Sequence, residues 1–100
     1  MHRTTHEIQA RSPVQILLNT VSRAIHKVRR ATEVQEELQQ ASLLLETMPL
    51  SIDQSALARN YLQSAGRYVR SCEYGSACWE LGTLRRYILG GIGLDDRALY

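Results

Sequence analysis

Apolar residues recur at steps of three and four along residues 12–48, and this pattern constrains the fold more than any other feature of the chain. Such spacing is typical of an amphipathic helix with one buried face. Ser12 and Pro13 suit the start of a helix, because a serine hydroxyl caps backbone N–H groups and proline fits the first helical position. Pro49 disfavours helical geometry at Met48 and so marks the end. No Gly or further Pro lies between the two prolines, so the sequence predicts one continuous helix.

A single helix of this length is too long for the rest of the chain to cover. About 35 residues would make a rod of roughly 50 Å, whereas a chain of 100 residues folds to a radius of gyration of only about 13 Å. We therefore expect the apolar residues in the first half of the rod, Leu17, Val21 and Ile25 among them, to need cover from another protein chain.

Two further helices are predicted after the turn at Pro49. Ser51 and Gln54 have the spacing of a capping box and start the second helix, which ends near Tyr74 with Gly75 as a left-handed residue. The third runs from Ser76 until Gly90 and Gly91 stop it. We expect Gly66 and Gly82, which lie inside these helices, to mark close helix–helix contacts.

The predicted fold is therefore all-α. A long N-terminal helix packs antiparallel against a second helix, and a shorter third helix completes a helical hairpin or three-helix bundle. Residues 1–11 form a flexible arm, residues 12–91 a single helical domain, and residues 92–100 a flexible or short helical tail.

Charge is distributed unevenly along the predicted rod. Six Lys or Arg residues and one acid precede Ala31, whereas five acids and no Lys or Arg occupy residues 31–58. This order opposes the helix macrodipole, which favours acids at the N-terminus and bases at the C-terminus. We interpret it as a sign of a packing partner with the reverse polarity. In the chain itself, Arg67 and Arg70 of the second helix are predicted to lie beside the acids Glu33, Glu36 and Glu37.

No residue pattern favours catalysis or a metal or other cofactor. His2 and His6 have a helical metal-ligand spacing but no third ligand near them in sequence. Cys72 and Cys78 each stand beside an acid, which raises a thiol pKa and disfavours the reactive thiolate. We therefore expect a protein that is not an enzyme and has no cofactor, no metal and no small-molecule substrate.

The predicted function is protein–protein interaction, as an adaptor, small chaperone or regulatory subunit that binds a partner helix or forms a homo-oligomer. Five Tyr and one Trp without any Phe suit half-buried binding surfaces. The predicted partner-binding residues are Leu17, Val21, Ile25, Tyr61, Tyr68, Trp79 and Tyr87.

The alternative is a basic helical regulator that binds nucleic acid, in which Arg23, Lys27 and Arg30 contact phosphates from one helical stripe. A net charge of only +2 makes this the weaker hypothesis. The longest apolar runs are too short to cross a membrane, and the two cysteines do not form a disulfide framework. We therefore expect a cytoplasmic protein without a membrane partner.

Overall fold

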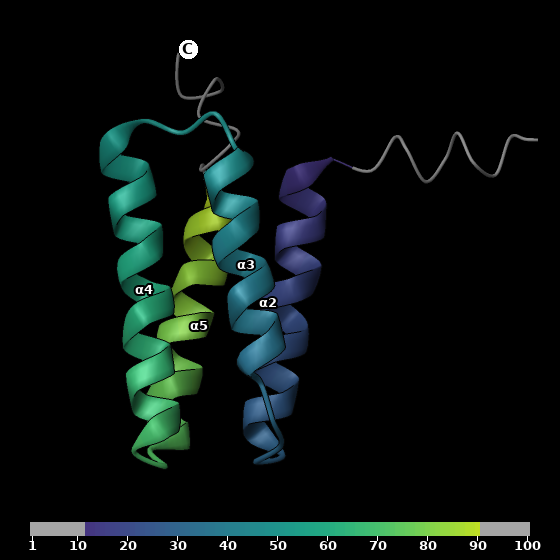
Figure 1. The fold of residues 1–100 in the computed structure, drawn as a ribbon, viewed down its shortest axis with the longest axis vertical. Helices are drawn as coiled ribbons and strands as arrows, with labels where there is room; N and C mark the ends of the chain where they lie inside the picture. The colour runs from purple at the N-terminus through teal and green to yellow at the C-terminus, as the bar shows by residue number, and fades with distance from the viewer. Residues whose placement is uncertain (1–11, 91–100) are drawn as a thin grey trace, which may run out of the picture.

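Residues 12–90 are described by a computed structural model, in which they form four antiparallel α-helices (Figure 1). The helices are α2 (Pro13–Arg29), α3 (Gln35–Thr47), α4 (Ile52–Arg70) and α5 (Tyr74–Gly90). Each helix packs against the next one along the chain, and α5 also packs against α2, which closes the bundle. The all-α class is confirmed. The predicted arm, 1–11, and tail, 92–100, lie outside the described residues.

The prediction of one long N-terminal helix is wrong, because the chain reverses direction between Arg29 and Gln35. Ala31 takes a left-handed backbone conformation with φ 55°. Its N–H donates to the Val28 carbonyl at 2.9 Å, and the Thr32 N–H donates to the Lys27 carbonyl at 2.9 Å. These two bonds form a Schellman motif, which satisfies the last carbonyls of α2 and turns the chain back.

The turn between α4 and α5 repeats this design. Cys72 has φ 61°, its N–H donates to the Val69 carbonyl at 3.0 Å, and the Glu73 N–H donates to the Tyr68 carbonyl at 2.8 Å. The left-handed residue is therefore Cys72 and not Gly75, which lies in the first turn of α5.

The predicted helix starts at Ser12 and Ser51 are confirmed. The Ser12 hydroxyl accepts from the Gln15 N–H at 3.1 Å. Ser51 and Gln54 form a full capping box, with both reciprocal bonds at 3.0 Å. The start of α3 has no such cap, because its N-cap residue is Val34, and the Glu33 carboxylate instead accepts from the Gln35 N–H at 2.8 Å.

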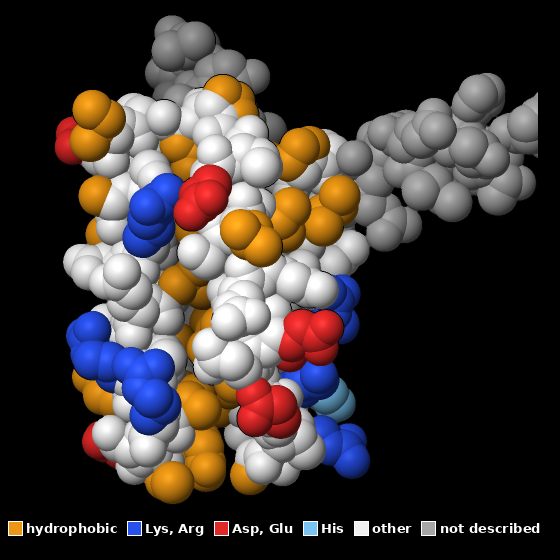
Figure 2. All heavy atoms as spheres, in the orientation of Figure 1, with side chains coloured by type: hydrophobic (Ala, Val, Ile, Leu, Met, Phe, Trp, Pro, Cys, Tyr) orange, Lys and Arg blue, Asp and Glu red, His pale blue; other side chains and the backbone are white. Residues whose placement is uncertain are grey.

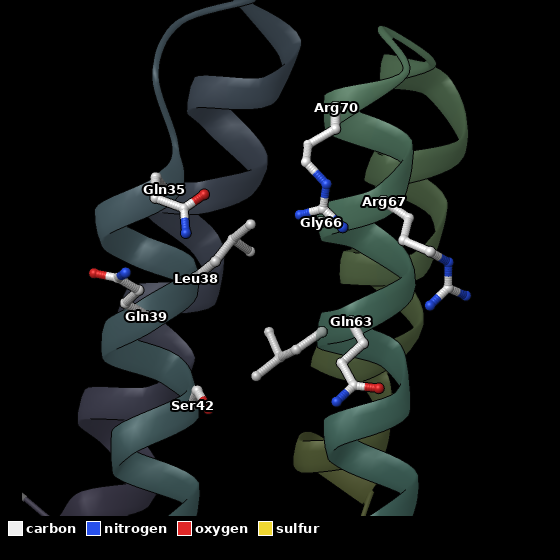
Figure 3. Close-up of a pocket in the computed structure, with 9 residues that line it drawn as sticks. Gln35, Leu38, Gln39, Ser42, Gln63, Gly66, Arg67 and Arg70 are labelled. Carbon is white, nitrogen blue, oxygen red and sulfur yellow. The ribbon is translucent and has the colours of Figure 1, made fainter.

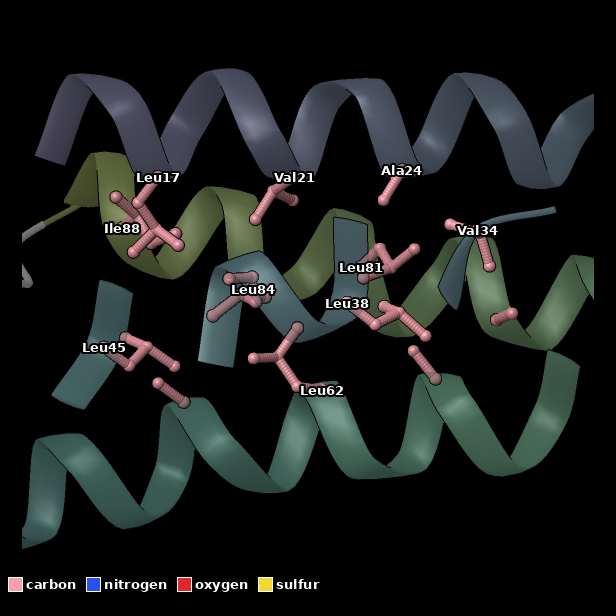
Figure 4. Close-up of a cluster of buried hydrophobic side chains, with 14 of the residues drawn as sticks. Leu17, Val21, Ala24, Val34, Leu38, Leu45, Leu62, Leu81, Leu84 and Ile88 are labelled. Atoms are coloured by element: carbon pink, nitrogen blue, oxygen red, sulfur yellow. The ribbon is translucent and has the colours of Figure 1, made fainter. Parts of the chain in front are cut away.

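The core runs along the bundle axis and takes side chains from all four helices (Figure 4). Leu17 of α2 lies beside Ile88 of α5, while Leu45 and Leu62 approach from α3 and α4 (Figure 4). Small residues, Ala58, Ala65 and Ala77, are fully buried. Each described helix is too short or too polar to cross a lipid bilayer.

Candidate functional site

Two of the predicted partner-binding residues belong to the core. Leu17 and Val21 are fully buried among residues of the same chain, because α3 and α5 cover α2. They are not available to a partner in this fold. They were assigned to a partner because the first half of a long helix was expected to be uncovered, and that reason no longer applies. Ile25 is half-buried and lies at the seam between α2 and α5.

The aromatic residues are only partly brought together. Tyr61 of α4 and Tyr87 of α5 meet edge to face, with ring centroids 6.3 Å apart and an interplanar angle of 64°. Tyr68 is also half-buried against the core. Trp79 is 63% exposed on α5. The predicted common groove of aromatic residues with Leu17 and Val21 is therefore not present in this fold.

The predicted nucleic-acid stripe is partly neutralised by contacts with other side chains. The Lys27 Nζ lies 2.7 Å from the Glu37 Oε2 across the seam between α2 and α3. Arg23 donates to Thr20 at 3.4 Å and to the Gln40 side chain at 3.5 Å. Arg30 remains exposed as the C-cap of α2.

Glu37 is a buried carboxylate, with 6% of its surface exposed. The hydrogen bond from Lys27 holds the pKa of Glu37 below its ordinary value, although burial alone would raise it. Its Oε1 atom has no hydrogen-bond partner among residues 12–90. The group stabilises the α2–α3 hairpin only while Lys27 remains beside it.

A groove separates α3 from α4, the two neighbouring helices that share the least contact (Figure 3). We call it the α3/α4 groove, and its volume is about 360 Å³. Leu38, Leu62 and Gly66 form its apolar floor, and Figure 2 shows hydrophobic side chains between these two helices. The polar residues that line the groove are Gln35, Gln39, Ser42, Gln63, Arg67 and Arg70. Figure 3 shows the Arg70 side chain extending toward α3 and the Arg67 side chain extending away from it.

The two arginines of this groove have no carboxylate partner among the described residues. Arg67 donates to the Ser64 hydroxyl at 3.1 Å. Arg70 lies over Gly66, where its Nη1 is 3.5 Å from the position that a Cβ would take. The predicted pairing of Arg67 and Arg70 with the acids of α3 is wrong, since the one ion pair within residues 12–90 joins Lys27 and Glu37.

Gly66 and Gly82, which were predicted to mark close helix–helix contacts, do not admit another backbone. Around a Cβ placed on Gly66, the atoms within 4 Å belong to the side chains of Arg70 and Leu38. The corresponding atom at Gly82 belongs to the Arg86 side chain, at 3.8 Å. Each glycine therefore provides a place where an arginine four residues later can lie low on its own helix.

A second seam brings together three further arginines, Arg29, Arg85 and Arg86. Between α2 and α5 lies a groove of about 400 Å³, which we call the α2/α5 groove. Its lining includes Ser22, His26 and Arg29 of α2 together with Gly82, Arg85 and Arg86 of α5. Of the described residues that line it, none is acidic.

Apolar side chains also reach the surface over α2 and α3 (Figure 2). Ile16 is 38% exposed and Leu43 is 61% exposed, and both lie beside Leu44 and Thr47 at the seam between these helices. The described residues contain no cluster of three or more His, Cys, Asp or Glu side chains that could hold a metal ion.

Sequence reasoning missed both grooves. Gln35 and Gln39 stand four residues apart, as do Gly66 and Arg70, and Gly82 and Arg86. This spacing places each pair on one helical face, but it does not reveal which faces oppose each other. A search among known proteins adds no further constraint, because no protein-family model, curated protein or solved structure matches this chain.

Proposed function

We propose that this protein is a non-enzymatic interaction module, and that its α3/α4 groove binds an acidic amphipathic segment of a partner protein. The observation that carries the proposal is the composition of the groove. An apolar floor lies beside two arginines that have no carboxylate partner among the described residues.

The floor suits an apolar side chain from a partner. Leu38 and Leu62 belong to the core, yet both retain some exposed surface, 9% and 6% respectively. Gly66, which has no side chain, lines the groove beside these two leucines and leaves a depression in the surface of α4. A leucine from a partner helix would bury apolar area here, at roughly 25 cal/mol per Å².

The rim specifies the charge of the partner. Arginine guanidinium groups form paired hydrogen bonds with carboxylates, so Arg67 and Arg70 favour Asp or Glu beside the apolar anchor. Side-chain amides of Gln35, Gln39 and Gln63 can donate to or accept from a partner backbone. This arrangement of a buried anchor and a polar rim is the usual composition of protein interfaces.

Nucleic-acid binding through Arg23, Lys27 and Arg30 has weaker support. Lys27 is held against the buried Glu37, and releasing it to a phosphate would leave that carboxylate without its cation. Self-association through one long helix is no longer expected, because this stretch forms two helices, α2 and α3, whose apolar residues are covered within the bundle.

The test uses a synthetic helical peptide with Leu at positions i and i+4 flanked by Glu, labelled for fluorescence anisotropy. We expect binding to the full chain in the micromolar range, and an Arg67→Glu/Arg70→Glu variant that binds at least about tenfold more weakly, since each lost charged hydrogen bond costs about 1.5–3 kcal/mol. The matched control is Arg30→Glu/Arg59→Glu, which changes the charge equally at two exposed positions outside the groove.

A second variant separates binding from folding. Gly66→Ala meets only ordinary contacts, at 3.5 and 3.8 Å, and should stabilise α4 by up to about 1 kcal/mol, yet its methyl group occupies the groove floor. We expect a higher melting temperature together with weaker peptide binding. Gly75→Ala, where no atom of the described residues lies within 4 Å of the new methyl group, is the control that leaves binding unchanged. A peptide that fails to bind, or binds equally well when Lys replaces Glu, would overturn the proposal.

A further inference from the structure

The α2/α5 groove concentrates positive charge on one seam of the bundle. Arg29 enters it from α2, and Arg85 and Arg86 enter it from α5. The whole chain has a net charge of only +2, so three arginines in one groove are a strong local excess.

These arginines do not serve as partners for acids within the fold. None of them forms an ion pair with a carboxylate among residues 12–90. Like charges that face one another across a helix seam oppose packing. A bound anion would remove this repulsion and would therefore bind to the folded bundle in preference to the unfolded chain.

One of the three guanidinium groups is already held in place. Arg86 donates from Nη2 to the Thr83 hydroxyl at 3.1 Å, and its Nη1 lies 3.8 Å from the position that a Cβ would take at Gly82. Because Gly82 has no side chain, this guanidinium can lie close to the backbone of α5 at the side of the groove. An arginine side chain that is already fixed loses less conformational entropy when a ligand binds.

We propose that the α2/α5 groove binds a compact phosphate-bearing ligand, of the pyrophosphate or phosphomonoester type. Arginine forks match phosphate oxygens in pairs, and the Ser22 hydroxyl and the His26 ring offer further donors from the opposite wall. The volume of about 400 Å³ lies in the range of small-ligand sites, about 300–1,000 Å³.

The arrangement favours a compact anion over an extended nucleic-acid backbone. Tracking a duplex requires basic residues spread along a surface, whereas the cations of this groove come from short stretches of two facing helices. On the other side of α2, the path of positive charge is interrupted where Lys27 pairs with Glu37.

The experiment follows the melting temperature of the full chain in sodium pyrophosphate, in inorganic phosphate and in sodium chloride at equal ionic strength. We expect a rise with pyrophosphate, a smaller rise with phosphate and none with chloride. Calorimetric titration with pyrophosphate gives the affinity. In Arg29→Gln/Arg85→Gln/Arg86→Gln we expect it to fall at least tenfold, because each lost charged hydrogen bond weakens binding by about that factor.

The control is Arg23→Gln/Arg30→Gln/Arg59→Gln, which removes the same charge from exposed positions outside the groove. It should retain the affinity for pyrophosphate. Equal losses in the two triple variants would show diffuse attraction and overturn the proposal, as would a pyrophosphate effect no larger than that of chloride. Tighter binding of a short DNA duplex than of pyrophosphate, lost in the first triple variant, would also overturn it and assign the groove to nucleic acid. None of these outcomes depends on the peptide binding proposed for the α3/α4 groove.

Discussion

The two hairpins of the bundle, α2–α3 and α4–α5, turn in the same way but are held together differently. Both reverse direction at a left-handed residue that is not glycine, Ala31 in one and Cys72 in the other. The α2–α3 seam contains a charged pair, Lys27 and the buried Glu37. The α4–α5 seam is the most extensive of the bundle and includes the edge-to-face contact of Tyr61 with Tyr87.

The difference shows how one turn geometry can serve two kinds of seam. Apolar packing does not depend on the ionisation of any group, whereas a charged pair is stabilising only while both groups keep their charge. We therefore expect the α2–α3 hairpin to respond to acid and to the loss of one cation, and the α4–α5 hairpin to respond to lost volume. Four predictions test this contrast.

The largest effect is expected from lost volume in α5. Leu84 is fully buried, and Leu84→Ala should reduce the free energy of unfolding by about 3 kcal/mol, within the 2–5 kcal/mol range for such truncations. Urea denaturation measures it. Leu89→Ala, at a position 53% exposed on the same helix, should cost less than about 0.5 kcal/mol. Similar losses at both positions would contradict the placement of the core.

The second effect comes from the charged pair. Lys27→Met leaves the Glu37 carboxylate buried without a cation, and we expect a loss of about 2 kcal/mol, below the 3–5 kcal/mol of a fully buried pair because Lys27 is partly exposed. Adding Glu37→Leu should recover most of this stability. Arg30→Met, at the exposed end of α2, is the control with little effect. An unchanged Lys27→Met protein would mean that the seam does not depend on charge.

A smaller effect should appear on acidification. The pKa of Glu37 in the folded state is lowered from its ordinary value of 4.5, so the charged carboxylate stabilises the fold above that value. This contribution is lost as the pH falls below 4.5 and through the lower folded pKa. Over this pH range, the free energy of unfolding of the native chain should converge with that of Glu37→Gln, which lacks the titrating group. Parallel pH dependence in the two proteins would assign the acid sensitivity to other carboxylates.

The smallest effect concerns the feature that the hairpins share. Ala31 and Cys72 are both exposed, and a left-handed conformation costs a non-glycine residue about 1–2 kcal/mol. Ala31→Gly and Cys72→Gly should each raise stability by roughly 0.5–1 kcal/mol, because the greater freedom of glycine in the unfolded chain offsets part of the gain. Ala56→Gly, at an exposed position inside α4, should have the opposite sign. Thermal denaturation distinguishes the two directions.

The sequence was sufficient to predict the helical class and the capped helix starts, because these depend on local chemistry. Ser51 and Gln54 lie three residues apart and cap α4 without help from the rest of the chain. The break in the long helix was missed for an equally local reason. Its left-handed residue is Ala31, whereas the expected signal was a glycine, and apolar residues continue at helical spacing through Val28 and Val34.

The charge order contained the missing information. Acids after bases oppose the macrodipole of one long helix, but they suit two helices that meet at a break. The last turn of α2 contains His26, Lys27 and Arg29, and the first turn of α3 contains Glu36 and Glu37. The same charge order that suggested an external partner is thus explained by a turn inside the chain.

Neither groove could be placed from the sequence, because each depends on which helix faces meet. The antiparallel pairing of residues 35–47 with α4 was expected from the turn at Pro49, but the sequence did not show that Leu38 and Gln39 would line one groove with Leu62 and Gln63. Trp79 and Tyr87 were predicted from aromatic composition alone to be partner-binding residues of one groove, and the structure places both on α5. Their distance from α3 follows from the order of the helices around the bundle, which no local pattern encodes.

The up-and-down path of the helices places Ser12 and Gly90 at the same end of the bundle, opposite the turns at Ala31 and Cys72 (Figure 1). A circular permutant of residues 12–90 could therefore join these two positions with a short linker and begin at Leu50, in the turn between α3 and α4. Such a rearranged chain would keep every helix neighbour while changing which hairpin is synthesised first. It would allow the charged and the apolar hairpins to exchange their places in the order of folding.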